Sequence, residues 1–107
     1  MPGRVRTRRQ FAQLTNPTKR GRSGPLRISF VEGAPEDREV SVAYAISRKV
    51  GNAVERNRIR RRLRALIDAE SSRLPAGIYL IKCGLETGKC TYDQLQHHLN
   101  EALRSFE

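Results

Sequence analysis

The segment from Ser47 to Arg64 constrains the fold more than any other part of this 107-residue chain. Gly51 permits a sharp turn, and the side chain of Asn52 can cap the helix that follows while Glu55 reaches back to the cap. The next apolar residues recur at helical spacing, which predicts a helix that continues to about Ala69 with one buried face. That face consists of Ile59, Leu63, Leu66 and Ile67.

The opposite face of this helix is basic. It consists of Asn57, Arg60, Arg61 and Arg64. Residues 48 to 64 contain eight Lys and Arg against Glu55 alone, and residues 1 to 30 contain eight against no acidic residue. Cations near a helix N-terminus cost roughly a few tenths of a kcal/mol each, and an anionic ligand can reverse this cost. The clustering, within a net charge of +10, favours a phosphate-rich partner over a solvated surface of mixed charge.

Two further helices are expected. The first covers Arg8 to Thr15, is capped by Thr7 with Gln10, and ends before Pro17 because Pro disfavours helical geometry in the residue before it. The last begins at Thr91, capped with Gln94, and carries a stripe typical of a core-facing helix. The stripe consists of Leu95, Leu99, Ala102, Leu103 and Phe106.

Three strands are expected between these helices, at Leu26 to Val31, Val40 to Ile46 and Ile78 to Ile81. An acidic, Pro-containing connection, Glu32 to Glu39, joins the first two. The Gly- and Arg-rich stretch from Pro17 to Pro25 is predicted to be a mobile loop. The middle strand has one face of small side chains, which leaves room for a ligand. These are Ser41, Ala43, Ala45 and Ser47.

The pattern predicts one RNA-binding domain, residues 1–107, with a basic and partly flexible segment 1–25. Its fold class is α/β, a sandwich in the order α-β-β(-β)-α-β-α, with the sheet covered on one side and partly open on the other. The second strand, the basic helix and the last strand form a βαβ crossover. Such crossovers are right-handed in about 98% of proteins.

Several function classes are disfavoured by the sequence. No apolar run is long enough for a membrane span or a signal peptide, so we expect a cytoplasmic protein without a membrane partner. Cys83 and Cys90 are read as reduced thiols, because six intervening residues do not match common zinc sites even with His97 and His98 nearby. An independent nuclease needs clustered carboxylates or a positioned His, and neither is evident. We therefore expect no catalytic residue, no metal site and no stable protein partner.

The run Arg48-Lys49-Val50-Gly51-Asn52-Ala53-Val54, followed by Arg56-Asn57-Arg58, resembles the bacterial ribonuclease P protein subunit family. The resemblance extends to a basic first helix with Phe11, a strand ending in Phe30, and Thr91-Tyr92-Asp93 at the last helix. It implies a subunit that joins a catalytic RNA to remove the 5′ leader of precursor tRNA. The RNA carries out this hydrolysis with Mg²⁺, so the protein itself needs no cofactor. The resemblance also implies a left-handed crossover.

The resemblance implies two sets of site residues. The RNA-binding set, to which helix facing adds Arg60, is Arg48, Lys49, Asn52, Arg56, Asn57, Arg58, Arg60, Arg61 and Arg64. The leader-binding groove, between the sheet and the first helix, is Phe11, Ile28, Phe30, Ala45, Arg48 and Lys49. Two features depart from the family: Leu14 and Thr15 stand where a second aromatic is common, and Lys82-Cys83-Gly84 follows the last strand.

Two alternatives stay open. Exposed Phe side chains can stack on unpaired bases, but either Phe11 or Phe30 taken alone is more readily explained as a core residue, because most Phe is buried. A structural RNA-binding protein, such as a ribosomal protein, would share the charge without the long motif. Cleavage of precursor tRNA in the presence of the catalytic RNA distinguishes that class from a ribonuclease P subunit.

Overall fold

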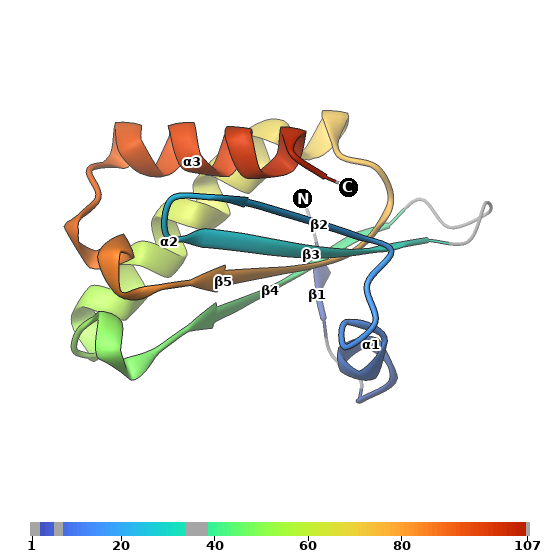
Figure 1. The fold of residues 1–107 in the computed structure, drawn as a ribbon, viewed down its shortest axis with the longest axis horizontal. Coiled ribbons are helices and arrows are strands. Elements are labelled where there is room, and N and C mark those ends of the chain that lie inside the picture. Colours follow the sequence, from blue (N-terminus) through green and yellow to red (C-terminus); the bar gives the residue numbers. More distant parts are fainter. Residues whose placement is uncertain (1–2, 6–7, 34–38, 107) are drawn as a thin grey trace.

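The computed structural model describes residues 3–5, 8–33 and 39–106 (Figure 1). Its elements are β1 (Gly3–Arg4), α1 (Arg8–Gln13), β2 (Lys19–Ser23), β3 (Leu26–Glu32), β4 (Val40–Ile46), α2 (Ala53–Glu70), β5 (Gly77–Cys83) and α3 (Tyr92–Arg104). Three short 3₁₀ helices are η1 (Arg48–Val50), η2 (Ser71–Arg73) and η3 (Leu85–Lys89). The strands form one five-stranded sheet in the order β1-β4-β5-β3-β2. The predicted α/β class is confirmed.

The sheet is built around the βαβ unit of β4, α2 and β5. β4 and β5 pair in parallel from Val40 opposite Gly77 to Ile46 opposite Cys83. β3 runs antiparallel to β5, and β2 antiparallel to β3. The two-residue strand β1 pairs with the start of β4 and was not predicted. α2 and α3 lie on one side of the sheet and α1 lies on the other (Figure 1).

The predicted helix after Gly51 is confirmed as α2, with its capping box and its apolar stripe. The N–H of Glu55 donates to Asn52 Oδ1 at 2.9 Å, and the N–H of Asn52 donates to Glu55 Oε1 at 3.1 Å. All four stripe residues are at most 4% exposed. The capping box of Thr91 with Gln94 is also present at α3, whereas the one expected at Thr7 lies outside the described residues.

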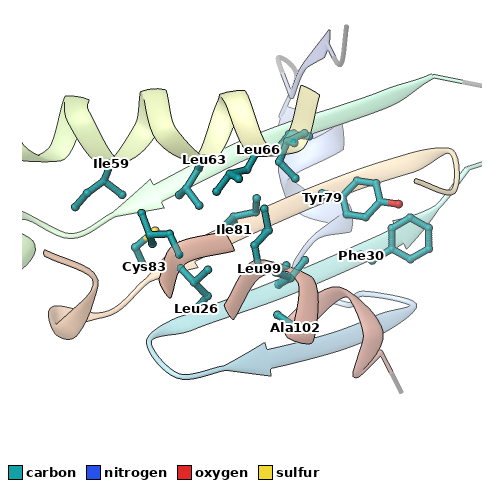
Figure 2. Packing of buried hydrophobic residues seen from close by; sticks show 14 of the residues in the cluster. Leu26, Phe30, Ile59, Leu63, Leu66, Tyr79, Ile81, Cys83, Leu99 and Ala102 are labelled. Atoms are coloured by element: carbon teal, nitrogen blue, oxygen red, sulfur yellow. The ribbon is translucent and has the colours of Figure 1, made fainter. Parts of the chain in front are cut away.

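The core fills the space between the sheet and the two long helices (Figure 2). α2 and α3 contribute the predicted stripes, and the even-numbered residues of β3 and odd-numbered residues of β5 face them from the sheet. Tyr79 and Phe30 lie side by side at one end, with ring centroids 4.7 Å apart. Leu103 and Phe106 pack at the margin of this cluster.

The stretch from Pro17 to Pro25, predicted as a mobile loop, instead contains β2 and a tight turn into β3. Gly24 occupies the left-handed region at φ +54°, which Gly adopts without strain. Gly21 lets the strand approach α3, because a Cβ there would collide with the carbonyl oxygen of Ala102. Only residues 32, 33 and 39 of the predicted acidic connection between β3 and β4 are described.

Candidate nucleic-acid interface

The basic face of α2 is displayed to solvent because the opposite face of the same helix is buried. Asn57, Arg61 and Arg64 are exposed, while Arg60 is half-buried. The Nη1 group of Arg60 donates to Asn57 Oδ1 at 2.7 Å, which orients its guanidinium along the helix. The predicted facing of these four residues is confirmed, with Arg60 nearer the sheet than expected. We call these four residues the arginine face.

The residues around the N-terminus of α2 extend this basic surface. Arg48 and Lys49 are exposed in η1, which is held by a hydrogen bond from the Lys49 N–H to Ser47 Oγ at 3.2 Å. Arg58 is also exposed. Arg56 differs, because it is half-buried and its Nε atom is buried without a hydrogen-bond partner in the described structure. Arg56 therefore contributes packing through its aliphatic stem as well as charge through its guanidinium.

These cations form no ion pair among the described residues. The ion pairs among the described residues lie elsewhere and are Arg73 with Glu70, Lys89 with Glu86, and Arg104 with Glu101. Glu55, the acidic residue closest in sequence, is engaged in the capping box. The arginine face therefore forms no ion pair within the part of the chain that the structure describes, and its field is available to a polyanion.

The open face of the sheet carries a second group of cations that the sequence analysis did not assign. Register places Arg22 opposite Arg27, and Arg27 opposite Lys82, in a line across β2, β3 and β5. Like charges directly opposite on neighbouring strands are unfavourable, so an anion bound to this row would stabilise it. With Arg20 it borders a hollow of about 730 Å³ that reaches the end of α1. The spacing of Arg20 and Arg22, two positions apart, was the sequence signal that could have indicated a basic strand face here, because alternate residues of a strand share a face.

The structure corrects two members of the predicted leader groove. Ile28 and Phe30 are 1% and 2% exposed and belong to the core beneath α2 and α3, on the face opposite the cation row. Alternation along β3 places Arg27 and Ser29, not Ile28 and Phe30, on the open face. Phe30 is therefore a core residue and is not available for stacking on bases.

The remaining groove residues are accessible but do not line one continuous hollow. Phe11 is 48% exposed and lines a second hollow, at the outer edge of β4. Ala45 is exposed, in register with Lys82 at the end of the cation row. Arg48 and Lys49 follow β4 directly. The accessible residues of the predicted groove thus lie at separate places, with Phe11 in α1 and with Arg48 and Lys49 in η1.

The thiols and imidazoles of the chain do not form a metal site within the described ranges. Burial raises the pKa of the Cys83 thiol to about 12, so it stays protonated at neutral pH. His98 is half-buried, with Nδ1 3.0 Å from Ser23 Oγ, and so has a structural partner between α3 and β2. Every helix in the described part of the chain is too short or too polar to cross a membrane.

Fold and surface together define a small basic α/β protein with two cationic surfaces, a helix face and an open sheet face, of the kind found in nucleic-acid-binding proteins. The sequence matches the Ribonuclease P family over residues 2–107, and the chain belongs to this family. It is 37% identical over 86 residues to the ribonuclease P protein component of Thermus scotoductus, a match that covers 80% of this chain and 51% of that protein. It is 31% identical over 110 residues to that of Brucella melitensis biotype 1, covering 94% and 77%.

Solved structures share this fold. The ribonuclease P protein of Staphylococcus aureus superposes with a TM-score of 0.82 at 20% identity, covering 97% of this chain and 94% of that one. The protein from Thermotoga maritima gives a TM-score of 0.78 at 19% identity, covering 94% and 96%. At these identities the superpositions establish a shared fold. The chain spans about half the length of the Thermus scotoductus relative.

Proposed function

We propose that this chain is the protein subunit of a ribonuclease P holoenzyme, in which a catalytic RNA cleaves the 5′ leader from precursor tRNA with Mg²⁺. The observation that carries this proposal is the arginine face of α2, which is largely exposed, follows Arg48 and Lys49 in the chain, and forms no ion pair among the described residues. Contacts of this kind hold phosphates, and they fix the position of a structured RNA without reading its sequence. The arginine face is assigned to the RNA subunit.

The open sheet face is assigned to the leader. Arg22, Arg27 and Lys82 can hold the phosphates of a single strand there, and Arg48 and Lys49 lie beyond the end of β4. Phe11 offers an exposed ring on which a base can stack, which is worth roughly 1 to 3 kcal/mol per base and does not depend on sequence. A leader of variable sequence suits such a surface.

The test is cleavage of precursor tRNA by the catalytic RNA at low Mg²⁺, with and without this chain. We expect the protein to restore cleavage and to bind precursor tRNA more tightly than mature tRNA. RNA-subunit affinity should fall with salt, with a slope in log units of about −0.7 to −0.9 per phosphate contact. Binding to RNA without any effect on cleavage would instead identify a structural RNA-binding protein.

A further inference from the structure

The outer edge of β4 lies next to a hollow. Among the described residues, β1 pairs with β4 at Ser41 and Val42, and β4 continues to Ile46. The hollow beside this edge measures about 580 Å³ and is lined from β1, α1, β4 and α2. We call it the edge hollow.

The edge hollow combines three kinds of side chain. Arg60 and Arg64 reach it from α2, and Arg4 from β1. Phe11 contributes an aromatic ring that is 48% exposed. Tyr44 and Asp68 also line it, and burial raises the pKa of the Tyr44 phenol to about 12, which keeps it a neutral O–H group. Cations, a stacking surface and a hydrogen-bonding carboxylate thus meet in one space.

Asp68 is the informative member of this set. It follows Arg64 by one helical turn, yet the two do not form an ion pair within 4 Å, and the ion pairs found among the described residues involve other side chains. Ser71 Oγ donates to the main-chain carbonyl of Asp68 and leaves the carboxylate open. A carboxylate repels phosphate and would weaken the binding of phosphate alone, but it accepts hydrogen bonds from N–H donors. Its presence points to a ligand with both phosphate and N–H groups.

A nucleotide has this chemistry, and the bases differ in how they suit a carboxylate. Guanine presents N1–H and N2–H side by side on its Watson–Crick edge, so both can donate to one carboxylate. Uracil places its N3–H between two carbonyl oxygens, which a carboxylate repels. Adenine and cytosine each offer an amino group next to a ring acceptor. Unpaired bases in RNA are commonly read at this edge while they stack on an aromatic ring.

We propose that the edge hollow binds one unpaired guanine nucleotide of an RNA strand. Asp68 accepts from N1–H and N2–H of the base, and Phe11 packs against the base. Arg60 and Arg64 hold the adjoining phosphates. This goes beyond the proposed function, in which phosphate contacts and stacking act without regard to base identity, and it adds sequence preference at a single position.

The experiment measures binding of the free protein to pentanucleotides of uridine that carry guanosine, inosine, adenosine or cytidine at the centre. For the unmodified protein we expect the guanosine oligomer to bind about tenfold more tightly than pentauridine, since charge-assisted hydrogen bonds are lost without it. Inosine, which lacks the N2 amino group, should lose part of that preference. Equal affinity for all central bases would overturn the proposal.

Two variants complete the test. Asp68→Asn should reduce the guanosine preference to about one, because an amide cannot accept both N–H groups. Asp93→Asn removes the same charge at an exposed position on α3 and should retain the preference. Thermal unfolding of both variants checks the fold. A guanosine preference that survives in a folded Asp68→Asn variant overturns the proposal, whereas the cleavage assay with catalytic RNA tests the ribonuclease P assignment independently.

Discussion

The ring of Phe30 stacks on that of Phe106, with centroids 5.6 Å apart and planes inclined by 14°. Phe30 comes from β3 and Phe106 from the residues after α3, so the contact fastens the C-terminal end of the chain to the sheet. The stack lies on the helix-covered face. Phe11 and Phe30, which were predicted to share one groove, therefore differ in their roles. Phe30 supports the fold, and Phe11 remains accessible.

Phe30→Ala should therefore affect mainly stability, and Phe11→Ala mainly the binding of the leader. Loss of the buried Phe30 ring should lower the free energy of unfolding by about 3 to 5 kcal/mol, whereas loss of the exposed Phe11 ring should change it by about 0.5 kcal/mol or less. Phe11→Ala should weaken holoenzyme binding to precursor tRNA once the leader is long enough to reach α1. Urea unfolding and affinities for stepwise shortened leaders check this. A stable Phe30→Ala variant with weakened leader binding would contradict the assignment.

The two faces of α2 allow a similar separation. Leu63 is fully buried, and Leu63→Ala should cost about 2 to 5 kcal/mol of stability. Arg61→Ala and Arg64→Ala should stay within about 0.5 kcal/mol of wild-type stability and weaken binding to the RNA subunit. Thermal melts and RNA-subunit affinities, measured on the same preparations, test the facing of the helix. An Arg61→Ala variant as unstable as Leu63→Ala would show that the facing is wrong.

Substitution of Gly21 should cause a steric clash between β2 and α3. In Gly21→Ala the new methyl group meets the Ala102 carbonyl and lies 2.9 Å from Phe106 Cδ1, so β2 must move away from α3. We expect a loss of roughly 1 to 3 kcal/mol of stability, as for other overpacked sites. Gly3→Ala is the matched control, because its nearest neighbour would be Ser41 Oγ at 3.8 Å. Denaturant unfolding that shows equal stability for the two variants would contradict the close approach.

Local sequence signals predicted much of this fold because several elements carry their own boundaries. α2 and α3 have capping boxes and apolar stripes, and both were correctly placed. β2 was missed, because a Gly- and Arg-rich segment has little strand propensity and becomes a strand only by pairing with β3. The cation row was missed for a related reason: Arg22, Arg27 and Lys82 meet through register, which is a tertiary property.

The error at Phe30 has a different origin. Alternation along β3 separates Leu26, Ile28 and Phe30 from Arg27 and Ser29, so the pattern itself indicates the buried face. The resemblance assigned Phe30 to the groove against this pattern. The edge hollow could not be predicted at all, since Asp68 and Tyr44 come together only when α2 crosses β4.

Cys83 predicts how stability depends on pH under alkaline conditions. Burial is the main cause that raises the pKa of its thiol from an ordinary 9.0 to about 12, although Arg60 and Thr87 lower it. Between these values the unfolded chain has lost the thiol proton while the folded chain retains it. Fewer protons are then bound in the unfolded state, so stability falls as pH rises, at about 1.4 kcal/mol per pH unit for one group. Below pH 9 this contribution is fully present.

Cys83→Val should remove that part of the pH dependence, because Val fills a similar apolar space and does not ionise. Urea unfolding at pH 8, 9.5 and 11 should show a steeper loss of stability for the wild-type protein than for the variant. Tyr44, whose pKa burial raises to about 12, continues to titrate in both proteins and leaves a shared decline. The difference between the two curves therefore isolates Cys83. Parallel curves would mean that the folded chain opens around β5 before the thiol loses its proton.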